Sequence, residues 1–400
     1  MLAQNSQCDY FPGQARRFAR GSKAKALLPL GLVILLFGLL LNDANAKTEA
    51  TALYSTVLKS MGQAIIIPHH QRLHDDITVM DKSIDSLCNE PSNDALIAVQ
   101  NAWRRAMSTW SGLSVVDFGP IDSLNALWKF QFWPDPLNLV HRKFKSRLSG
   151  RISTNTADDL ANASVAIQGL SAVEYLLFDP ALDPLRNTAR QPQFCAILKN
   201  TSLNLQQYAV LLNDRWANNY GDRWHSKIID QQRSGFLKQN FEKLFSSVVA
   251  TLEASVELKL AKPLGLSKVI QSPEKIDFIE MPQPNPWRLE SWRSKNSLQN
   301  LQSNLEFLHE MYSHERGLGW LLVELSNKNK KLDRKIRRKF DQVFSAMASF
   351  EEPLFVTIEQ GDFDEIRALM RTLIELHFLI KNRYAEATDI TFRFNSLDGD

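Results

Sequence analysis

Apolar residues recur every three or four positions along most of the chain, which is the spacing of an amphipathic α-helix. Leu298, Leu301, Leu305 and Leu308 show this spacing most plainly and predict a helix that ends near Tyr312. No run of alternating Val, Ile and Thr suggests a sheet, and only 16 of the 400 residues are glycine. The pattern therefore predicts an all-α protein.

Prolines and glycines, which start or end helices, set the other expected boundaries. One helix is expected to begin at Thr51 and another at Pro68, since proline is favoured in a first turn. Further helices are expected at about 92–113, 156–178, 191–220, 235–260, 331–350 and 363–388. Short helices or loops rich in Trp and Pro are expected at 121–150.

Long helices on both sides of Gly221 predict two helical bundles of the four-helix type, packed together. The expected organisation is a signal peptide at 1–46, an N-terminal bundle at 47–222 and a C-terminal bundle at 223–400. Five of the 16 prolines lie within 263–286, which predicts an ordered connector inside the second bundle.

The N-terminal segment has the pattern of an export signal. A basic stretch ends at Lys25, an apolar run covers 26–41, and Ala44-Asn45-Ala46 is a small-x-small cleavage site. The alternative is an uncleaved N-terminal anchor. No cysteine follows the apolar run, so a lipoprotein anchor is not expected. We predict a periplasmic protein with no membrane span after cleavage.

The charge of the chain argues against a nucleic-acid partner. The first 46 residues carry five of the 47 basic residues and two of the 44 acidic ones, so the remainder is neutral. A basic cluster at 328–339 could bind a nucleic acid or an anionic membrane, but a solvated helix face explains it more simply. The mature chain keeps Cys88 and Cys195, which could form a disulfide in an oxidising compartment or remain buried thiols.

Glu174 is the first candidate site residue. On a helix it shares a stripe with Ile167, Leu170, Ser171 and Leu177. A carboxylate that faces a core must be paired, protonated or bound to a cation. Glu174 is therefore either a structural acceptor for a neighbouring Arg or Trp, or a ligand for a metal or other bound group.

Two further segments contain candidate ligand-binding residues. In 291–297, Arg293 is a candidate partner for Glu174 or for the C-terminal acids, and Ser294 is a candidate N-cap for the leucine-striped helix. Ser297 has simple capping as its alternative role. At the C-terminus, Asp398 and Asp400 follow two aromatic residues that predict a packed tail rather than a frayed one.

Taken together and in this order, several segments resemble the imelysin-like family of exported bacterial proteins, sometimes classed as peptidases and often linked to iron uptake. The matching segments are Ile66-Ile67-Pro68, Ala102-Trp103 to Trp110, Phe118-Gly119-Pro120, 169–178, Trp292-Arg293-Ser294 to Ser297-Leu298, and 394–400. The resemblance implies an all-α fold of two bundles with a pocket between them. It also implies a role in iron uptake.

The family's Gly-x-His-x-x-Glu motif is proposed to bind metal through its His and Glu. Here Gly169 and Glu174 match, but Ser171 stands in place of the His. A serine hydroxyl is a poor metal ligand, so the resemblance does not carry over the complete metal site. Any divalent metal or iron is expected at Glu174.

Three functions remain open from the sequence. A polar pocket built from Glu174, Arg293 and the C-terminal acids, and walled by Trp103, Trp110 and Trp292, would bind a small ligand or metal. A metallopeptidase is less expected, because a catalytic zinc needs about three protein ligands and no His-Glu-x-x-His occurs. His70 and His74 would share one face of a helix and could chelate a metal. The third function is a structural role with a protein partner in the cell envelope.

Overall fold

The structure is a computed structural model that describes residues 51–149, 156–190, 192–220, 224, 234–274 and 283–390. These residues form helices and no strands, which confirms the predicted all-α class. Residues 51–60 are helical and lead into the first labelled elements. The elements up to residue 220 are η1 (Met61–Ile66), α2 (Ile67–Asn89), α3 (Asn93–Leu113), α4 (Pro120–Ser123), α5 (Ala126–Phe130), α6 (Leu139–Leu148), α7 (Ala157–Ala161), η2 (Val165–Ile167), α8 (Gly169–Phe178), α9 (Pro184–Arg190), α10 (Pro192–Asp214) and η3 (Arg215–Tyr220).

The later elements follow the same all-helical pattern. They are α12 (Ser234–Ala254), η5 (Ser255–Ala261), η6 (Lys262–Leu264), η8 (Pro286–Arg288), α13 (Ser297–Ser313), α14 (Leu318–Leu325), η9 (Asn327–Asn329), α15 (Lys330–Ala348), α16 (Leu354–Gln360), α17 (Asp364–Phe378), η10 (Leu379–Tyr384) and α18 (Ala385–Thr388).

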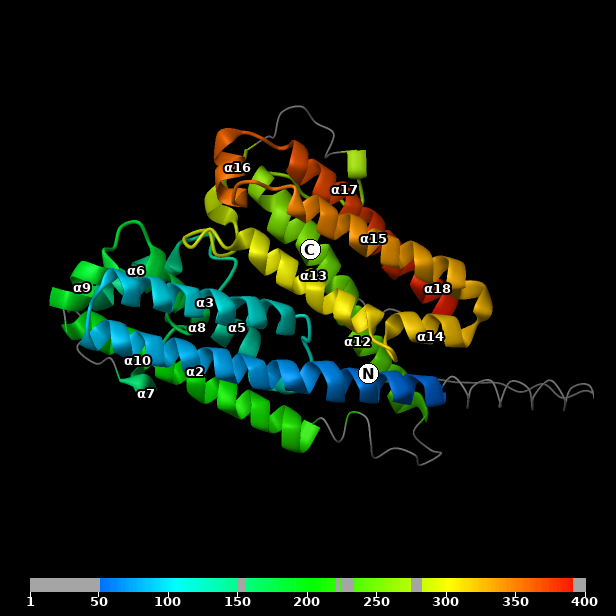
Figure 1. The fold of residues 1–400 in the computed structure, drawn as a ribbon, viewed down its shortest axis with the longest axis horizontal. Coiled ribbons are helices and arrows are strands. Elements are labelled where there is room, and N and C mark those ends of the chain that lie inside the picture. The colour runs from blue at the N-terminus through cyan, green and yellow to red at the C-terminus, as the bar shows by residue number, and fades with distance from the viewer. Residues whose placement is uncertain are drawn as a thin grey trace, which may run out of the picture. The chain divides into compact units, whose positions relative to one another are not determined.

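The long helices pack side by side in two groups. Helix α2 lies between α3 and α10, and α15 packs on α17, which also contacts α12 (Figure 1). Helix α13 packs on α3 of the first group and on α15 of the second. The division of the chain into two domains near residue 222 stays a prediction.

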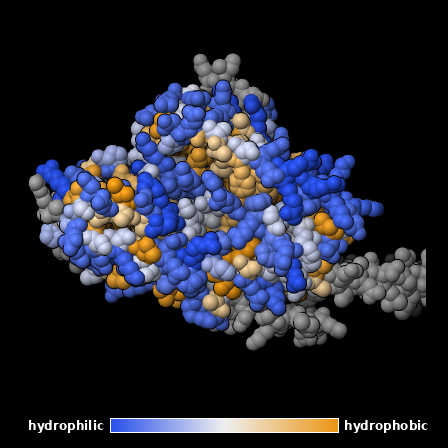
Figure 2. All heavy atoms as spheres, viewed as in Figure 1, coloured by the Kyte–Doolittle hydropathy of each residue, from blue (hydrophilic) through white to orange (hydrophobic). Residues whose placement is uncertain are grey.

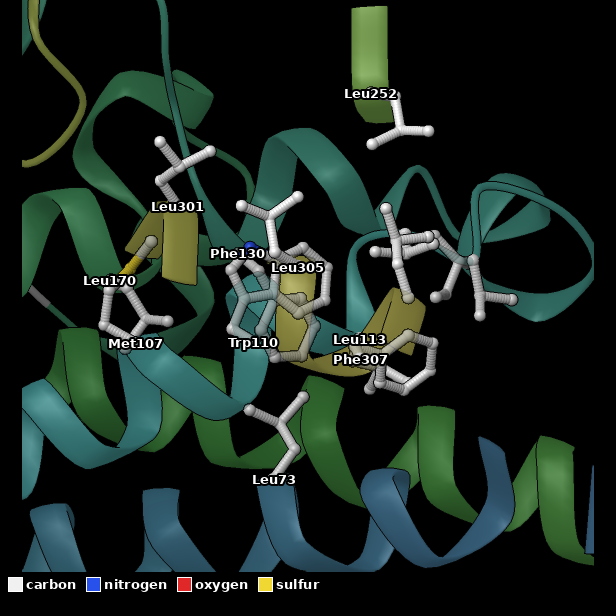
Figure 3. Close-up of a cluster of buried hydrophobic side chains, with 14 of the residues drawn as sticks. Leu73, Met107, Trp110, Leu113, Phe130, Leu170, Leu252, Leu301, Leu305 and Phe307 are labelled. Carbon is white, nitrogen blue, oxygen red and sulfur yellow. The ribbon is translucent and has the colours of Figure 1, made fainter. Parts of the chain in front are cut away.

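The core at the junction of α3 and α13 is aromatic and aliphatic. Trp110 of α3 stacks on Phe130 of α5 with ring centroids 4.4 Å apart. Leu301 and Leu305 of α13 lie beside this pair (Figure 3). All four side chains are fully buried, so each contributes about 1.5–3 kcal/mol of apolar transfer free energy to folding. This core fixes the start of α13 relative to the first group of helices.

The sequence correctly predicted the helices whose apolar stripe is unbroken. Helix α3 begins after Ser92, whose hydroxyl accepts a hydrogen bond from the Ala95 N–H at 3.2 Å. The leucine stripe forms α13, and the helices expected at 331–350 and 363–388 form α15 and the α17–η10–α18 run. Helices α14 and α16 were not predicted, because each is only two turns long.

The prediction that a separate helix starts at Pro68 is wrong. Residues 51–89 form one continuous helix, which contains the π-helical segment η1 just before Pro68. Proline lacks an N–H, and its ring clashes with the carbonyl four residues earlier in a regular α-helix. A π-helical turn changes the hydrogen-bonding register there, so the helix continues through Pro68 instead of starting again.

The prediction of a single helix over 156–178 is also wrong. The chain forms α7, η2 and α8 in succession, and the break before α8 falls at Gly169. Gly169 has a φ of 70°, and a Cβ at this position would lie 2.3 Å from the carbonyl oxygens of Lys129 and Phe130. Glycine is needed here because only it combines a left-handed φ with such a close approach of backbones.

Cys88 of α2 and Cys195 of α10 form a disulfide, with Cα atoms 5.8 Å apart. It links two neighbouring helices of the first group. Within the described ranges, no helix has the length and hydrophobicity needed to cross a bilayer. The predicted signal peptide at 1–46 lies outside the described residues.

Candidate functional site

Helix α8 holds Glu174 inside the protein. Eight of its ten residues are buried, and Glu174 is only 4% exposed. The helix packs on α3 and α10, and the close approach at Gly169 fixes its N-terminus against the end of α5. A carboxylate in this position has lost most of its hydration, so its partners decide its charge.

The partners come from the turns that precede α13. Glu174 Oε1 accepts two hydrogen bonds from Ser294, from N–H at 3.0 Å and from Oγ–H at 2.8 Å. Ser291 and Lys295 on either side have left-handed φ values of 48° and 57°. Asn300 of α13 donates to Ser291 Oγ at 2.9 Å and so anchors this turn.

The prediction that Ser294 caps the leucine-striped helix is therefore wrong. Helix α13 begins at Ser297, and its N-cap residue is Asn296, which makes no side-chain capping bond. The turn places Ser294 against α8 instead of above the helix start. Ser297 Oγ donates to the Glu290 carbonyl at 2.5 Å, so Ser297 also closes the turn rather than contacting Glu174.

Arg293 is held beside Glu174 by a different acid. Its Nε donates to Asp179 Oδ2 at 2.7 Å, and a terminal nitrogen donates to Asn138 Oδ1 at 2.9 Å. The guanidinium lies over the rings of Trp292 and Tyr175, at 4.4 Å and 5.3 Å from their centroids. Arg293 was a candidate partner for Glu174 or for the C-terminal acids; its ion pair among the described residues is with Asp179, and the C-terminal acids lie outside the described residues.

A second buried ion pair lies next to this network. Lys259 of η5 contacts Glu290 Oε2 at 2.6 Å and Asn304 Oδ1 at 2.7 Å. Glu290 Oε1 also accepts from Gln131 Nε2 at 2.8 Å, and Gln131 Oε1 accepts from the Trp110 indole at 3.2 Å. Glu290 is 3% exposed, so these hydrogen bonds and the ion pair replace the water that its carboxylate has lost.

The cluster contains one more carboxyl group than cations. It contains three buried carboxylates, Glu174, Asp179 and Glu290, and two cations, Arg293 and Lys259. Burial raises the pKa of Glu174, and the Glu290 charge adds to that effect. The Ser294 N–H, the Arg293 charge and the Ser294 hydroxyl lower the pKa without cancelling the effect of burial. Binding of a further positive charge would stabilise the ionised form.

The other predicted site residues are only partly brought together. Ser171 Oγ accepts from the Phe132 N–H at 3.1 Å, one turn before Glu174 on α8. Trp103 is fully buried and donates to the Leu170 carbonyl at 2.9 Å, so it supports α8 from the core side. Trp292 is half-buried and stacks on Phe355. Asp398 and Asp400 lie outside the described residues.

Sequence reasoning missed Asp179, Glu290 and Lys259. Asp179 directly follows the helix expected over 156–178, and its use as an ion-pair partner depends on tertiary structure. Lys259 carried a weak signal, because it lies between two leucines, Leu258 and Leu260, in a helical segment. A charge in such a position requires a buried partner.

The described part of the chain brings few potential metal ligands together. No group of three or more His, Cys, Asp or Glu side chains there could hold a metal ion. His70 is buried, with its Nδ1 2.8 Å from the Ile66 carbonyl oxygen, and burial lowers its pKa to about 3. His74 is half-buried, and its Nδ1 lies 3.3 Å from Asp75 Oδ1. The chelating pair considered from their spacing stays a prediction.

The fold and site define an all-helical protein with a buried, acid-rich polar cluster between packed helices. Residues 66–378 match the family model described as imelysin (peptidase M75), so the chain belongs to the imelysin family. This confirms the family resemblance seen in the sequence.

Known proteins agree with this assignment. The chain is 23% identical to iron-regulated protein A of Synechococcus elongatus over 78% of this chain and 80% of that protein. The crystal structure of an imelysin-like protein from Psychrobacter arcticum matches with a TM-score of 0.70 and 18% identity, over 86% of this chain and 98% of that one. The structure of a protein described as an iron-regulated protein A precursor, from Parabacteroides distasonis, matches with a TM-score of 0.64 and 16% identity, over 85% and 95%.

Proposed function

We propose that this protein is an exported binding protein that takes up a positively charged ligand, a metal ion or a cationic group, at the Glu174 cluster. The observation that carries the proposal is the charge balance of the cluster, in which three buried carboxylates share two cations. Asp179 and Glu290 pair with Arg293 and Lys259, so Glu174 is the carboxylate left without a cation, and a bound cation would allow it to ionise despite its burial. The proposed site consists of Glu174, Ser294 and the surrounding polar side chains.

The donor set restricts which cation fits. The oxygen atoms nearest to a cation at this site would be those of the Glu174 carboxylate and the Ser294 hydroxyl, because the other contact of Glu174 is a backbone N–H and the Ser171 hydroxyl accepts from the Phe132 N–H. A His–Glu clip for iron or zinc is not formed by the described residues, because Ser171 replaces the histidine of the family motif. Oxygen donors favour hard cations such as Ca²⁺ or Mg²⁺. Iron binding at this site would need further ligands, for which Asp398 and Asp400 are the candidates.

An iron-related role is supported by the names of the relatives rather than by the site. Two similar proteins have names that describe them as iron-regulated protein A. We propose that this chain takes part in iron uptake, either by binding the metal or by binding a partner in the cell envelope.

Export is supported by three separate observations. The first 46 residues have the pattern of a secretory signal. The Cys88–Cys195 disulfide is of a kind that persists in oxidising compartments. One structural relative is described as a precursor. We propose the periplasm as the location of the mature protein.

We do not extend the proposal to peptidase activity. A catalytic zinc takes about three protein ligands and a water, and the described residues bring no three such side chains together. The family's name alone does not assign this chemistry to the chain, because a fold carries many functions.

The test is cation binding by purified protein, measured by elemental analysis and by calorimetry with Ca²⁺, Mg²⁺, Zn²⁺ and Fe²⁺. Glu174→Gln is compared with Glu359→Gln, which changes an exposed acid of α16 in the same way. Stoichiometric binding that only Glu174→Gln abolishes supports the proposal. If no cation binds and Glu174→Gln only lowers the melting temperature, Glu174 is structural and the proposal fails.

A further inference from the structure

A cavity of about 440 Å³ lies between α6 and the η2 segment, and none of its lining residues is one of the charged residues of the Glu174 cluster. Three cationic side chains line it, Arg142, Lys143 and Arg147. Small-molecule sites in proteins typically have volumes of about 300–1,000 Å³. The cavity is therefore large enough for a small organic molecule.

The sequence of α6 explains why the cations face this cavity. Val140 and Phe144 occupy the buried face of the helix. Arg142 and Lys143 lie on the neighbouring face and are exposed. Neither forms an ion pair with any described residue, so their charges are available to a ligand. Asp135 accepts from the N–H groups at the start of α6, which fixes the position of the helix.

Arg147 places a third charge deeper in the cavity. It is 6% exposed, and burial lowers the pKa of its guanidinium while Asp159 partly offsets that effect. Asp159 is itself held by the Thr156 N–H and hydroxyl at the start of α7. Arg142 and Lys143 therefore contribute the positive charge of the cavity that no described ion pair uses, and Arg147 adds a buried guanidinium beside Asp159.

The rest of the lining is apolar. Leu139, Ala163 and Ile167 contribute aliphatic surface. Ser146 and Ser164 add two hydroxyl groups. In Figure 2, the end of the molecule that carries α6 and α9 shows apolar side chains bordered by strongly hydrophilic ones. A bare inorganic anion would use the cations and leave this apolar surface without a partner.

We propose that this cavity binds a small organic anion. A carboxylate or other acidic group of the ligand contacts Arg142, Lys143 and Arg147, and its apolar body lies against Leu139, Ala163 and Ile167. Bidentate pairing with arginine favours a planar carboxylate. The site is independent of the proposed cation site at Glu174.

The test is calorimetric titration of the full chain with phthalate, which has two carboxylates on an aromatic body. Inorganic phosphate tests charge without an apolar body, and benzamide tests an aromatic body without charge. The variant Arg142→Gln/Lys143→Gln removes the two exposed cations of the cavity. Lys145→Gln is the matched control, since Lys145 is exposed on the same helix and does not line the cavity.

We expect phthalate to bind more tightly than phosphate or benzamide. The double variant should weaken phthalate binding about tenfold or more, as expected for loss of charge-assisted contacts, while Lys145→Gln changes it less than about twofold. The proposal is overturned if phthalate does not bind at millimolar concentration, or if phosphate binds equally well. An equal loss in Lys145→Gln would also overturn it, because it would show attraction by general charge. A thermal melt of each variant shows that it is folded.

Discussion

Glu174 of α8 accepts two hydrogen bonds from one residue 120 positions later in the chain, Ser294, through its N–H at 3.0 Å and its hydroxyl at 2.8 Å. The contact joins α8 to the turns that precede α13. It also satisfies one oxygen of a carboxylate that is otherwise removed from water. The protonation state of this carboxylate therefore depends on the geometry of a turn that is distant in the sequence.

Ser294→Ala tests this contact. The variant keeps the backbone N–H and removes the hydroxyl, so one of the two bonds to Oε1 is lost. We expect the free energy of unfolding at neutral pH to fall by about 1–2 kcal/mol, the usual cost of removing a partner from a buried charged group. We also expect the pKa of Glu174 to rise further, since the lost bond favours the ionised form.

Urea unfolding measures the stability change. Ser345→Ala is the matched control, because Ser345 is exposed on α15 and its hydroxyl donates to the Asp341 carbonyl of the same helix. The control should change stability by less than about 0.5 kcal/mol. Equal effects in the two variants would mean that the Ser294 hydroxyl contributes nothing specific to the site.

Glu253 predicts a pH dependence that is separate from the Glu174 cluster. It accepts from His377 Nε2 at 3.1 Å and from Lys381, which joins α12 to α17 and η10. Burial alone would raise its pKa, but the bonds to His377 and Lys381 dominate and lower it to about 2. Stability from this group is therefore present above its unfolded pKa of about 4.5 and is lost as pH falls toward 2.

Glu253→Gln should lower the free energy of unfolding at pH 7 by about 1–2 kcal/mol, after allowance for partial screening by solvent. The difference from wild type should shrink as the pH is lowered below about 4. Urea unfolding at several pH values measures it, with Glu359→Gln as the exposed control. A difference that stays constant with pH would show that the carboxylate charge is not the cause.

The disulfide gives a third prediction. Cys88 and Cys195 close a loop with a sequence separation of 107, and loops of this length stabilise a fold by about 3–5 kcal/mol through the unfolded chain. Cys88→Ser/Cys195→Ser should lose that amount in urea unfolding. Dithiothreitol should destabilise the wild type to the same extent and leave the double variant unchanged. Free thiol in the untreated mature protein would show that the bond does not form.

The sequence predicted those parts of the molecule that depend on local periodicity. Helix α13 follows from its leucine stripe, and α3 follows from its stripe and the Ser92 cap. Glu174 stood out because a lone carboxylate on an apolar stripe is unusual. None of these inferences needed a distant part of the chain.

The parts that could not be predicted depend on contacts between distant segments. The choice of Asp179 as the partner of Arg293 follows from how α8 and the 291–295 turns meet. The role of Ser294 depends on the same contact between these two segments. In the sequence, a serine that caps a helix cannot be told apart from a serine that belongs to a site. Continuation of the first helix through Pro68 depends on a π-helical segment that no composition rule indicates.

The break at Gly169 leads to the last prediction. The residue combines a φ of 70° with a backbone approach that leaves no room for a Cβ, since that atom would lie 2.3 Å from two carbonyl oxygens of α5. Gly169→Ala must therefore move α8 or α5, and α8 carries Glu174. We expect the free energy of unfolding to fall by about 3 kcal/mol or more, together with loss of any cation binding at Glu174.

Gly235→Ala is the matched control. Gly235 lies in α12, and a Cβ there would have nothing within 4 Å. Because alanine is the better helix former, this variant should be more stable by about 0.5–1 kcal/mol. Urea unfolding of both variants gives the comparison. If Gly169→Ala were as stable as wild type, the contact between α8 and the α5 carbonyls would not be as close as the structure shows, and the placement of Glu174 would need to be revised.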